Sequence, residues 1–209
     1  MNKSGAAIEQ RQGQALVDSS LKHGVKHLVY SSVDRGGDER SFNNPTDVPH
    51  FVSKHNIEKH LIEKSKGADM SWTILRPVAF MENITDKNIG SIFCTAWRTT
   101  NLRSLQLVAA EDIGVFAAKS FMEVDKFKSR AISLAGDDLS FDQMQKVYKE
   151  VKKTEPPHTW GLVVKAVFWF SAEMRTMFNF FANEGYGANI ADLKKIHPGL
   201  KDVKAFLKA

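Results

Sequence analysis

Gly24-Val-Lys-His-Leu-Val-Tyr-Ser-Ser32 is the stretch that decides the fold of this 209-residue chain. Its central part, Lys26–Ser32, is short and contains the apolar run Leu28-Val-Tyr30, which is typical of a strand buried on both faces of a parallel sheet. The residues before it, Glu9–His23, have helical spacing, and Gly24 stands where a helix commonly ends. A helix that leads into such a strand indicates an α/β fold.

The alternation of helical and strand patterns continues along the chain, which indicates a layered α/β architecture. Ser140-Phe-Asp-Gln143 has the form of a capping box that opens a helix. The expected strands are Ser71–Leu75, Ser104–Ala109 and Ala131–Leu134. The expected helices are Phe51–Lys66, a segment from Glu82 toward Trp97, Glu111–Val124, Ser140–Lys153 and two short helices within Ile190–Leu207. The helix Glu111–Val124 is expected to bury one face, which carries Ile113, Phe116, Ala117 and Phe121.

The composition is that of an ordinary globular protein, with 43% hydrophobic and 25% charged residues. The formal net charge is +5, but basic residues alternate with acidic ones, as in solvated helix faces. We therefore expect no direct nucleic-acid binding. The sequence shows no signal-peptide pattern and no apolar run long enough to span a bilayer. We expect a cytoplasmic protein, with the nucleus as a second location and no membrane partner.

Cysteine and histidine usage gives no pattern for a metal site. Cys94 is the single cysteine, which excludes an intramolecular disulfide, and we expect it to be a small buried hydrophobe. His50, His55 and His60 recur every five residues, and that spacing spreads them around a helix. We therefore expect no metal.

Aromatic and methionine residues are dense between Trp160 and Phe181. They could line an apolar ligand pocket or pack as helical core. Core packing is the favoured interpretation, because aromatic side chains dominate core burial in general.

His50-Phe-Val-Ser-Lys54 is the strongest local candidate for chemistry. At the start of a helix, positions i and i+4 lie on one face, so the imidazole and the ammonium would project together. They would lie beside the carboxyl end of the preceding strand, where open α/β sheets bind ligands. Lys54 could donate to ribose hydroxyls, and His50 could orient a carbonyl or move a proton. The alternative is an exposed His and Lys on a polar helix face.

Arg76-Pro-Val-Ala-Phe-Met-Glu-Asn83 follows a predicted strand and enters a helical pattern. Pro77 fixes the direction in which the chain leaves the sheet. Phe80–Asn83 would then border the same crevice. The alternative is a structural turn with Asn83 as a helix cap.

These segments together resemble the NmrA-like branch of the atypical short-chain dehydrogenases/reductases, especially its fungal members. The resemblance covers Glu9–Leu207. The matching elements, in order, are Ser31-Ser32 after the apolar strand, His50-x-x-x-Lys54, Ile74-Leu-Arg-Pro-Val-Ala-Phe-Met-Glu-Asn83, Glu111-Asp-Ile-Gly114 and Glu184-Gly-Tyr-Gly-Ala188.

The resemblance implies a Rossmann-type parallel sheet followed by a smaller, mostly helical substrate or regulatory lobe. On this basis we expect residues 1–135 to form the C-terminal part of an NAD(P)-binding domain and residues 136–209 to form the lobe. The chain is expected to lack strands one to four of the family, and with them the glycine-rich loop that binds the cofactor phosphates. The implied cofactor is NADP, or NAD.

The site residues that the resemblance implies are carried over by position. Lys54 matches the family's cofactor-contacting lysine, and Phe80, Met81, Glu82 and Asn83 match the segment beside the nicotinamide. Arg11 stands where a relative has a basic cofactor contact, and Ser31 follows the apolar strand. His50 replaces the tyrosine of the family's Tyr-x-x-x-Lys pair and is the catalytic candidate.

Three functions are open at this point. The first is an NAD(P)-dependent oxidoreductase that acts on a small organic substrate, as in secondary metabolism. The second is a non-catalytic NAD(P) sensor that binds a transcription factor or another protein, which the loss of the tyrosine at His50 favours. The third is an inactive remnant, because a partial Rossmann sheet leaves an open strand edge.

Overall fold

A computed structural model describes residues 3–100 and 102–209. Its central sheet is parallel, in the order β1 (His27–Ser31), β2 (Ser71–Pro77) and β5 (Arg130–Leu134). The α/β fold with a parallel sheet predicted from the sequence is confirmed. Within the described residues β1 pairs only with β2, so its other edge is open.

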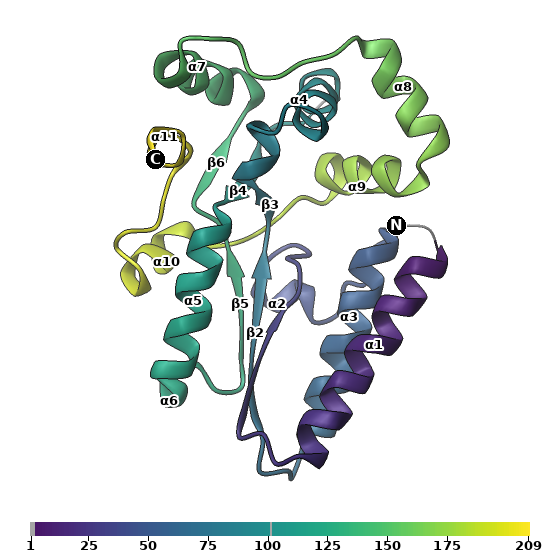
Figure 1. The fold of residues 1–209 in the computed structure, drawn as a ribbon, viewed down its shortest axis with the longest axis vertical. Coiled ribbons are helices and arrows are strands. Elements are labelled where there is room, and N and C mark those ends of the chain that lie inside the picture. Colours follow the sequence, from purple (N-terminus) through teal and green to yellow (C-terminus); the bar gives the residue numbers. More distant parts are fainter. Residues whose placement is uncertain (1–2, 101) are drawn as a thin grey trace.

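Helices cover both faces of this sheet (Figure 1). On one face α1 (Lys3–Lys22) and α3 (Pro49–Lys64) pack side by side, and Ile74 of β2 joins their core cluster. On the other face Leu75 packs with Phe116 of α5 (Ala110–Met122). Successive residues of a strand point to opposite faces of the sheet. Because helices cover both faces, β2 needs apolar residues at successive positions to pack against both helical layers.

A second, smaller sheet continues from β2. It has the order β3 (Ala79–Phe80), β4 (Leu105–Val108) and β6 (Asp137–Leu139), with β4 and β6 antiparallel. The sequence predicts β4 but neither β3 nor β6. Both are too short to show a strand pattern, and β6 is acidic.

The remaining elements surround these two sheets. They are α2 (Asp38–Ser41), the 3₁₀ helix η1 (Met81–Ile84), α4 (Ile89–Thr99), α6 (Val124–Phe127), α7 (Phe141–Lys152), α8 (Gly161–Phe170), α9 (Ala172–Asn183), α10 (Ile190–Ile196) and α11 (Val203–Lys208). The capping box at the start of α7 is confirmed, since Ser140 and Gln143 bond reciprocally. Gly24 has φ +71°, in agreement with its predicted place at the end of α1.

Two sequence predictions about helices are wrong. The single helix expected from Glu82 toward Trp97 is divided into η1 and α4, because the Asp86 carboxylate accepts from the amides of Asn88 and Ile89 and starts a new helix there. Phe121 is 56% exposed instead of buried. It lies in the last turn of α5, where the partly exposed ring of His27 packs edge-on against it.

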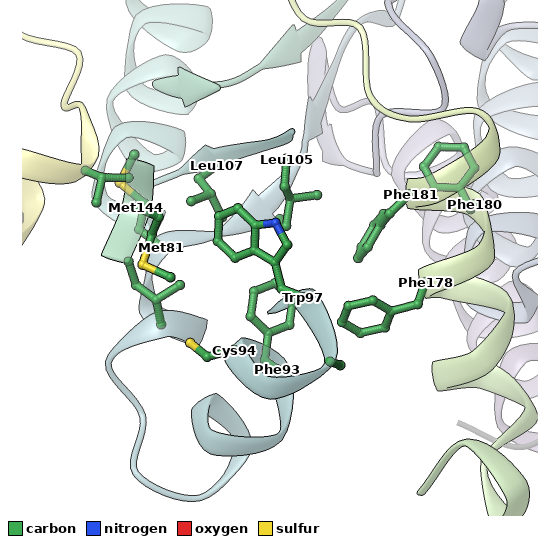
Figure 2. Packing of buried hydrophobic residues seen from close by; sticks show 14 of the residues in the cluster. Met81, Phe93, Cys94, Trp97, Leu105, Leu107, Met144, Phe178, Phe180 and Phe181 are labelled. Carbon is green, nitrogen blue, oxygen red and sulfur yellow. The ribbon is translucent and has the colours of Figure 1, made fainter. Parts of the chain in front are cut away.

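Trp97 lies at the centre of the largest core cluster (Figure 2). Its indole is 1% exposed and makes edge contacts with Phe93 and Phe141. Cys94 is buried in the same cluster, as predicted, and burial raises the pKa of its thiol to about 12.

The aromatic segment from Trp160 to Phe181 has two different environments. Phe178, Phe180 and Phe181 of α9 belong to the core, as the favoured interpretation predicts. Trp169 and Phe170 of α8 do not, since they are 80% and 86% exposed. The interpretation of the whole segment as core packing is therefore wrong for Trp169 and Phe170, whereas Phe168 on the other side of α8 does pack against the core.

Candidate functional site

The loop that follows β1 is anchored by two of its own charged side chains, which are buried in the protein. Asp34 and Arg35 are both 0% exposed. Asp34 accepts from the backbone amides of Gly36, Gly37 and Gly187, and so ties this loop to the segment after α9. These hydrogen bonds hold the loop in place beside the cleft described next.

The cleft, of about 240 Å³, opens at the carboxyl ends of β1 and β2. Its walls are apolar, with a few polar groups at its edge, the composition typical of small-molecule sites. The lining comes from the ends of both strands, the first turns of α3, the β3–η1 segment, α4, α9 and the segment after α9: Ser32, Val33, His50, Phe51, Lys54, Pro77, Val78, Ala79, Phe80, Asn83, Phe93, Met177, Phe181 and Tyr186.

Lys54 is in the cleft wall and is held by a carboxylate from α1. Its Nζ donates to Oε1 of Glu9 at 2.7 Å, and the two side chains are 25% and 24% exposed. Ser53 also donates to Glu9. Although burial opposes ionisation, these hydrogen bonds from Lys54 and Ser53 lower the pKa of Glu9 below its ordinary value. The ammonium is thus oriented by Glu9, a charged partner that is not among the site residues predicted from the sequence.

His50 lies one helical turn before Lys54 and lines the same cleft, as the i, i+4 spacing predicts. Its Nδ1 is 2.6 Å from Oε1 of Glu173 in α9. Burial and the positive charge of Lys54 lower the pKa of His50 from 6.5 to about 4. At pH 7 the ring is therefore neutral, and its contact with Glu173 joins a neutral imidazole to a carboxyl group.

The four consecutive candidates after β2 separate in space. Phe80, 40% exposed, and Asn83 line the cleft. Met81 is fully buried in the core cluster around Trp97, so its side chain does not reach the cleft. Glu82 points away from it and accepts from the backbone amide of Ala110 at the start of α5. The turn of the 3₁₀ helix causes this separation, which residue spacing alone does not show.

Arg11 and Ser31 are not among the residues that line the cleft. Arg11 is exposed on α1, and Ser31 is exposed at the end of β1. The neighbouring Ser32 lines the cleft instead. Strand alternation explains this difference, because adjacent side chains point to opposite sides.

Tyr186 also lines the cleft, although it is not among the site residues predicted from the sequence. The segment Gly185-Tyr-Gly187 lacks a preceding strand and is no phosphate loop, but it brings the Tyr186 ring into the cleft against Phe180 and Phe181. Burial, together with the charge of Asp34, raises the pKa of the Tyr186 hydroxyl well above its ordinary value. In the sequence, Tyr186 is indicated only by the resemblance of Glu184-Gly-Tyr-Gly-Ala188 to the NmrA-like family.

The described residues, 3–100 and 102–209, contain neither a metal-binding cluster nor a membrane-spanning helix. No group of three or more His, Cys, Asp or Glu side chains in this part of the chain is placed to hold a metal ion. No helix in the same part of the chain has the length and apolar character needed to cross a membrane.

Comparison with known proteins gives a family. The sequence profile of the NmrA-like family matches residues 1–207. The chain belongs to the NmrA-like family. A relative from Dictyostelium discoideum, an NmrA-like family domain-containing protein, is 23% identical over 190 residues. That match covers 87% of this chain and 62% of the relative, so the chain spans about three fifths of the length of its curated relative.

Two solved structures have a fold similar to that of this chain. The triphenylmethane reductase of Citrobacter sp., complexed with NADP(H), superposes with a TM-score of 0.71 at 15% identity, over 97% of this chain and 71% of that one. The negative transcriptional regulator NmrA, in complex with NAD, gives a TM-score of 0.68 at 15% identity, over 98% and 70%. The Rossmann-type fold predicted for this chain is confirmed by these likenesses.

Proposed function

We propose that this protein is an NAD(P)-dependent oxidoreductase that acts on a small organic substrate, as in secondary metabolism, and that the cleft holds the nicotinamide end of the cofactor. The observation that carries the proposal is the convergence of Lys54, Asn83 and aromatic walls at the carboxyl ends of β1 and β2. Ligands of open α/β sheets bind in this place. The bound NADP(H) and NAD of the two related structures support the cofactor class.

The groups in the cleft suit a nicotinamide and its ribose. The Lys54 ammonium would donate to ribose hydroxyls, and the Asn83 amide offers both a donor and an acceptor for a carboxamide. Phe80 and Phe181 provide flat apolar surface for the ring. The volume, about 240 Å³, lies below the ~300–1,000 Å³ of sites that enclose a whole ligand. The cleft therefore fits one end of a dinucleotide, and that cofactor supplies a hydride when bound.

Reduction of a substrate carbonyl also requires a protein group that polarises the carbonyl oxygen. His50 and Tyr186 are the candidates, because both line the cleft and neither is charged at pH 7. The Tyr186 hydroxyl keeps its proton and would donate a hydrogen bond to the oxygen. His50 of α3, which is in contact with Glu173 of α9, would orient the substrate.

Titration of the full chain with NADPH, followed by quenching of protein fluorescence, tests the cofactor assignment. We expect saturable binding and, on addition of quinones or triphenylmethane dyes, a loss of the absorbance of reduced nicotinamide. Absence of NADPH binding would contradict the assignment.

A second candidate is a non-catalytic NAD(P) sensor. The observation that favours it is that neither His50 nor Tyr186 has a pKa near neutrality, where general acids and bases are most effective. The contact between His50 and Glu173 also connects the cleft to α9, the kind of link through which a bound cofactor could alter a protein-binding surface. Binding of NADPH and NADP⁺ without consumption of NADPH, whichever substrate is added, would support the sensor and contradict the oxidoreductase.

A further inference from the structure

Helix α8 turns an apolar stripe toward solvent. The exposed apolar side chains of this helix, counted from Leu162, recur at positions i, i+1, i+4, i+7 and i+8, which lie on one side of a helix. Trp169 is 80% exposed and Phe170 86%, and Trp160 at the N-terminal end is 80% exposed. The stripe consists of Trp160, Leu162, Val163, Ala166, Trp169 and Phe170.

The opposite side of α8 already packs in the core. Val164 is 3% exposed and belongs to the cluster around Trp97, and the helix contacts α4 and α9. Figure 1 shows α8 at the outer edge of the helical layer. The outward aromatic residues therefore do not pack the fold itself. Large exposed apolar patches mark interaction sites in soluble proteins.

On α8 and the two helices that it contacts, basic side chains outnumber acidic ones. Helices α4, α8 and α9 carry Arg98, Lys165 and Arg175, which are all exposed. None of these three forms an ion pair with a carboxylate in the part of the chain that the structure describes, and Arg175 donates to the carbonyl of Phe168 at the end of α8. The one acidic residue on these three helices, Glu173, is 14% exposed and lies against His50.

We propose that the α8 stripe docks on a membrane surface that contains anionic lipids. Trp side chains favour the boundary between the headgroups and the acyl chains, because the ring is apolar and its N–H can still bond to water. A helix in this position buries its apolar side shallowly, while neighbouring Lys and Arg reach the lipid phosphates. The proposal replaces the expectation, drawn from the sequence alone, that the protein has no membrane partner. It does not depend on cofactor binding or on catalysis.

A second copy of the chain fits this face less well. A symmetric dimer through α8 would use the same stripe on both copies. Lys165 lies near the middle of the ten-residue helix, so two antiparallel copies would bring the two ammonium groups together. Such like charges repel at close range, whereas an anionic surface attracts both.

The test is co-sedimentation of the full chain with vesicles, using phosphatidylcholine alone and phosphatidylcholine mixed with phosphatidylserine. We expect binding to the mixed vesicles, weaker binding at high salt, and little binding to phosphatidylcholine alone. Intrinsic fluorescence gives a second readout, because Trp72 and Trp97 are buried while Trp160 and Trp169 are exposed. The emission should shift to the blue only with the mixed vesicles.

Matched double variants locate the binding surface. Trp169→Ser with Phe170→Ser should weaken vesicle binding at least about tenfold, because the membrane-buried apolar area is lost. Phe121→Ser with Met122→Ser removes two exposed apolar side chains from α5 and should bind like the wild type. Lys165→Glu, also at an exposed position, should reduce the preference for phosphatidylserine.

Three results would overturn the proposal. The first is no binding to the mixed vesicles, and the second is binding that is unchanged in the α8 double variant. The third is a stable dimer in light scattering that the α8 double variant dissociates, since a second copy would then cover the stripe.

Discussion

Arg76 binds both carboxylate oxygens of Glu58, with Nε 3.2 Å from Oε1 and Nη2 2.7 Å from Oε2. Arg35 donates to the same Oε2 at 2.8 Å, and all three side chains are at most 2% exposed. This cluster joins the end of β2 and the loop after β1 to α3, the helix that carries Lys54. It therefore fixes the two sides of the cleft relative to each other.

We predict that Glu58→Gln destabilises the protein by about 3–5 kcal/mol, because it leaves two buried guanidinium groups without their counter-charge. Although burial opposes ionisation, Arg76 and Arg35 lower the pKa of Glu58, so its charge is present at neutral pH. Urea unfolding measures the change. Glu63→Gln, on the exposed side of the same helix, is the control and should leave the unfolding midpoint close to that of the wild type, because exposed ion pairs contribute little to stability. Equal unfolding midpoints for the two variants would contradict the role of the cluster.

The sequence predicts the elements that carry a strong local pattern. The apolar run of β1, the spacing of α3 and the capping box before α7 are properties of neighbouring residues, so they can be read without a structure. The division between η1 and α4 depends on which amides the Asp86 side chain accepts from, and β3 and β6 exist only because β4 pairs with them. These features arise from contacts that a single segment does not encode.

The cleft shows the same limit. The i, i+4 spacing of His50 and Lys54 places both side chains in it, but Glu9 and Glu173, which hold them, come from distant helices. Tyr186 enters through a segment whose glycines indicate only a turn. The burial of Arg35 was not predictable either, because a charged side chain is buried only where the fold supplies its partners.

The pH dependence of stability should report the burial of His50. Its pKa falls from 6.5 to about 4 on folding, so the unfolded chain takes up the proton first as the pH decreases. The resulting contribution to stability is complete above pH 6.5 and is lost between pH 6.5 and pH 4, by about 2–4 kcal/mol. Urea unfolding from pH 7 to pH 4 should show this loss in the wild type and a smaller one in His50→Gln. The exposed His23→Gln is the control, and identical slopes in all three proteins would contradict the burial of His50.

Tyr186→Phe separates turnover from binding. If the hydroxyl polarises the substrate oxygen, the variant should bind NADPH like the wild type while its rate of NADPH consumption falls about 10²- to 10⁴-fold, the range typical of a lost proton-donating group. Fluorescence titration and the absorbance of reduced nicotinamide measure the two quantities. An unchanged rate would remove Tyr186 from the reaction, and a matching loss of binding would show that it serves the cofactor instead.

The central claim is that Lys54 holds the ribose of a bound nicotinamide cofactor, and NADPH titration of Lys54→Ala tests it most directly. The account predicts a loss of about 1–3 kcal/mol, roughly 5- to 150-fold in Kd. Lys59→Ala, an exposed lysine on the same helix, should bind NADPH like the wild type. Equal NADPH affinity in Lys54→Ala and the wild type would contradict the account.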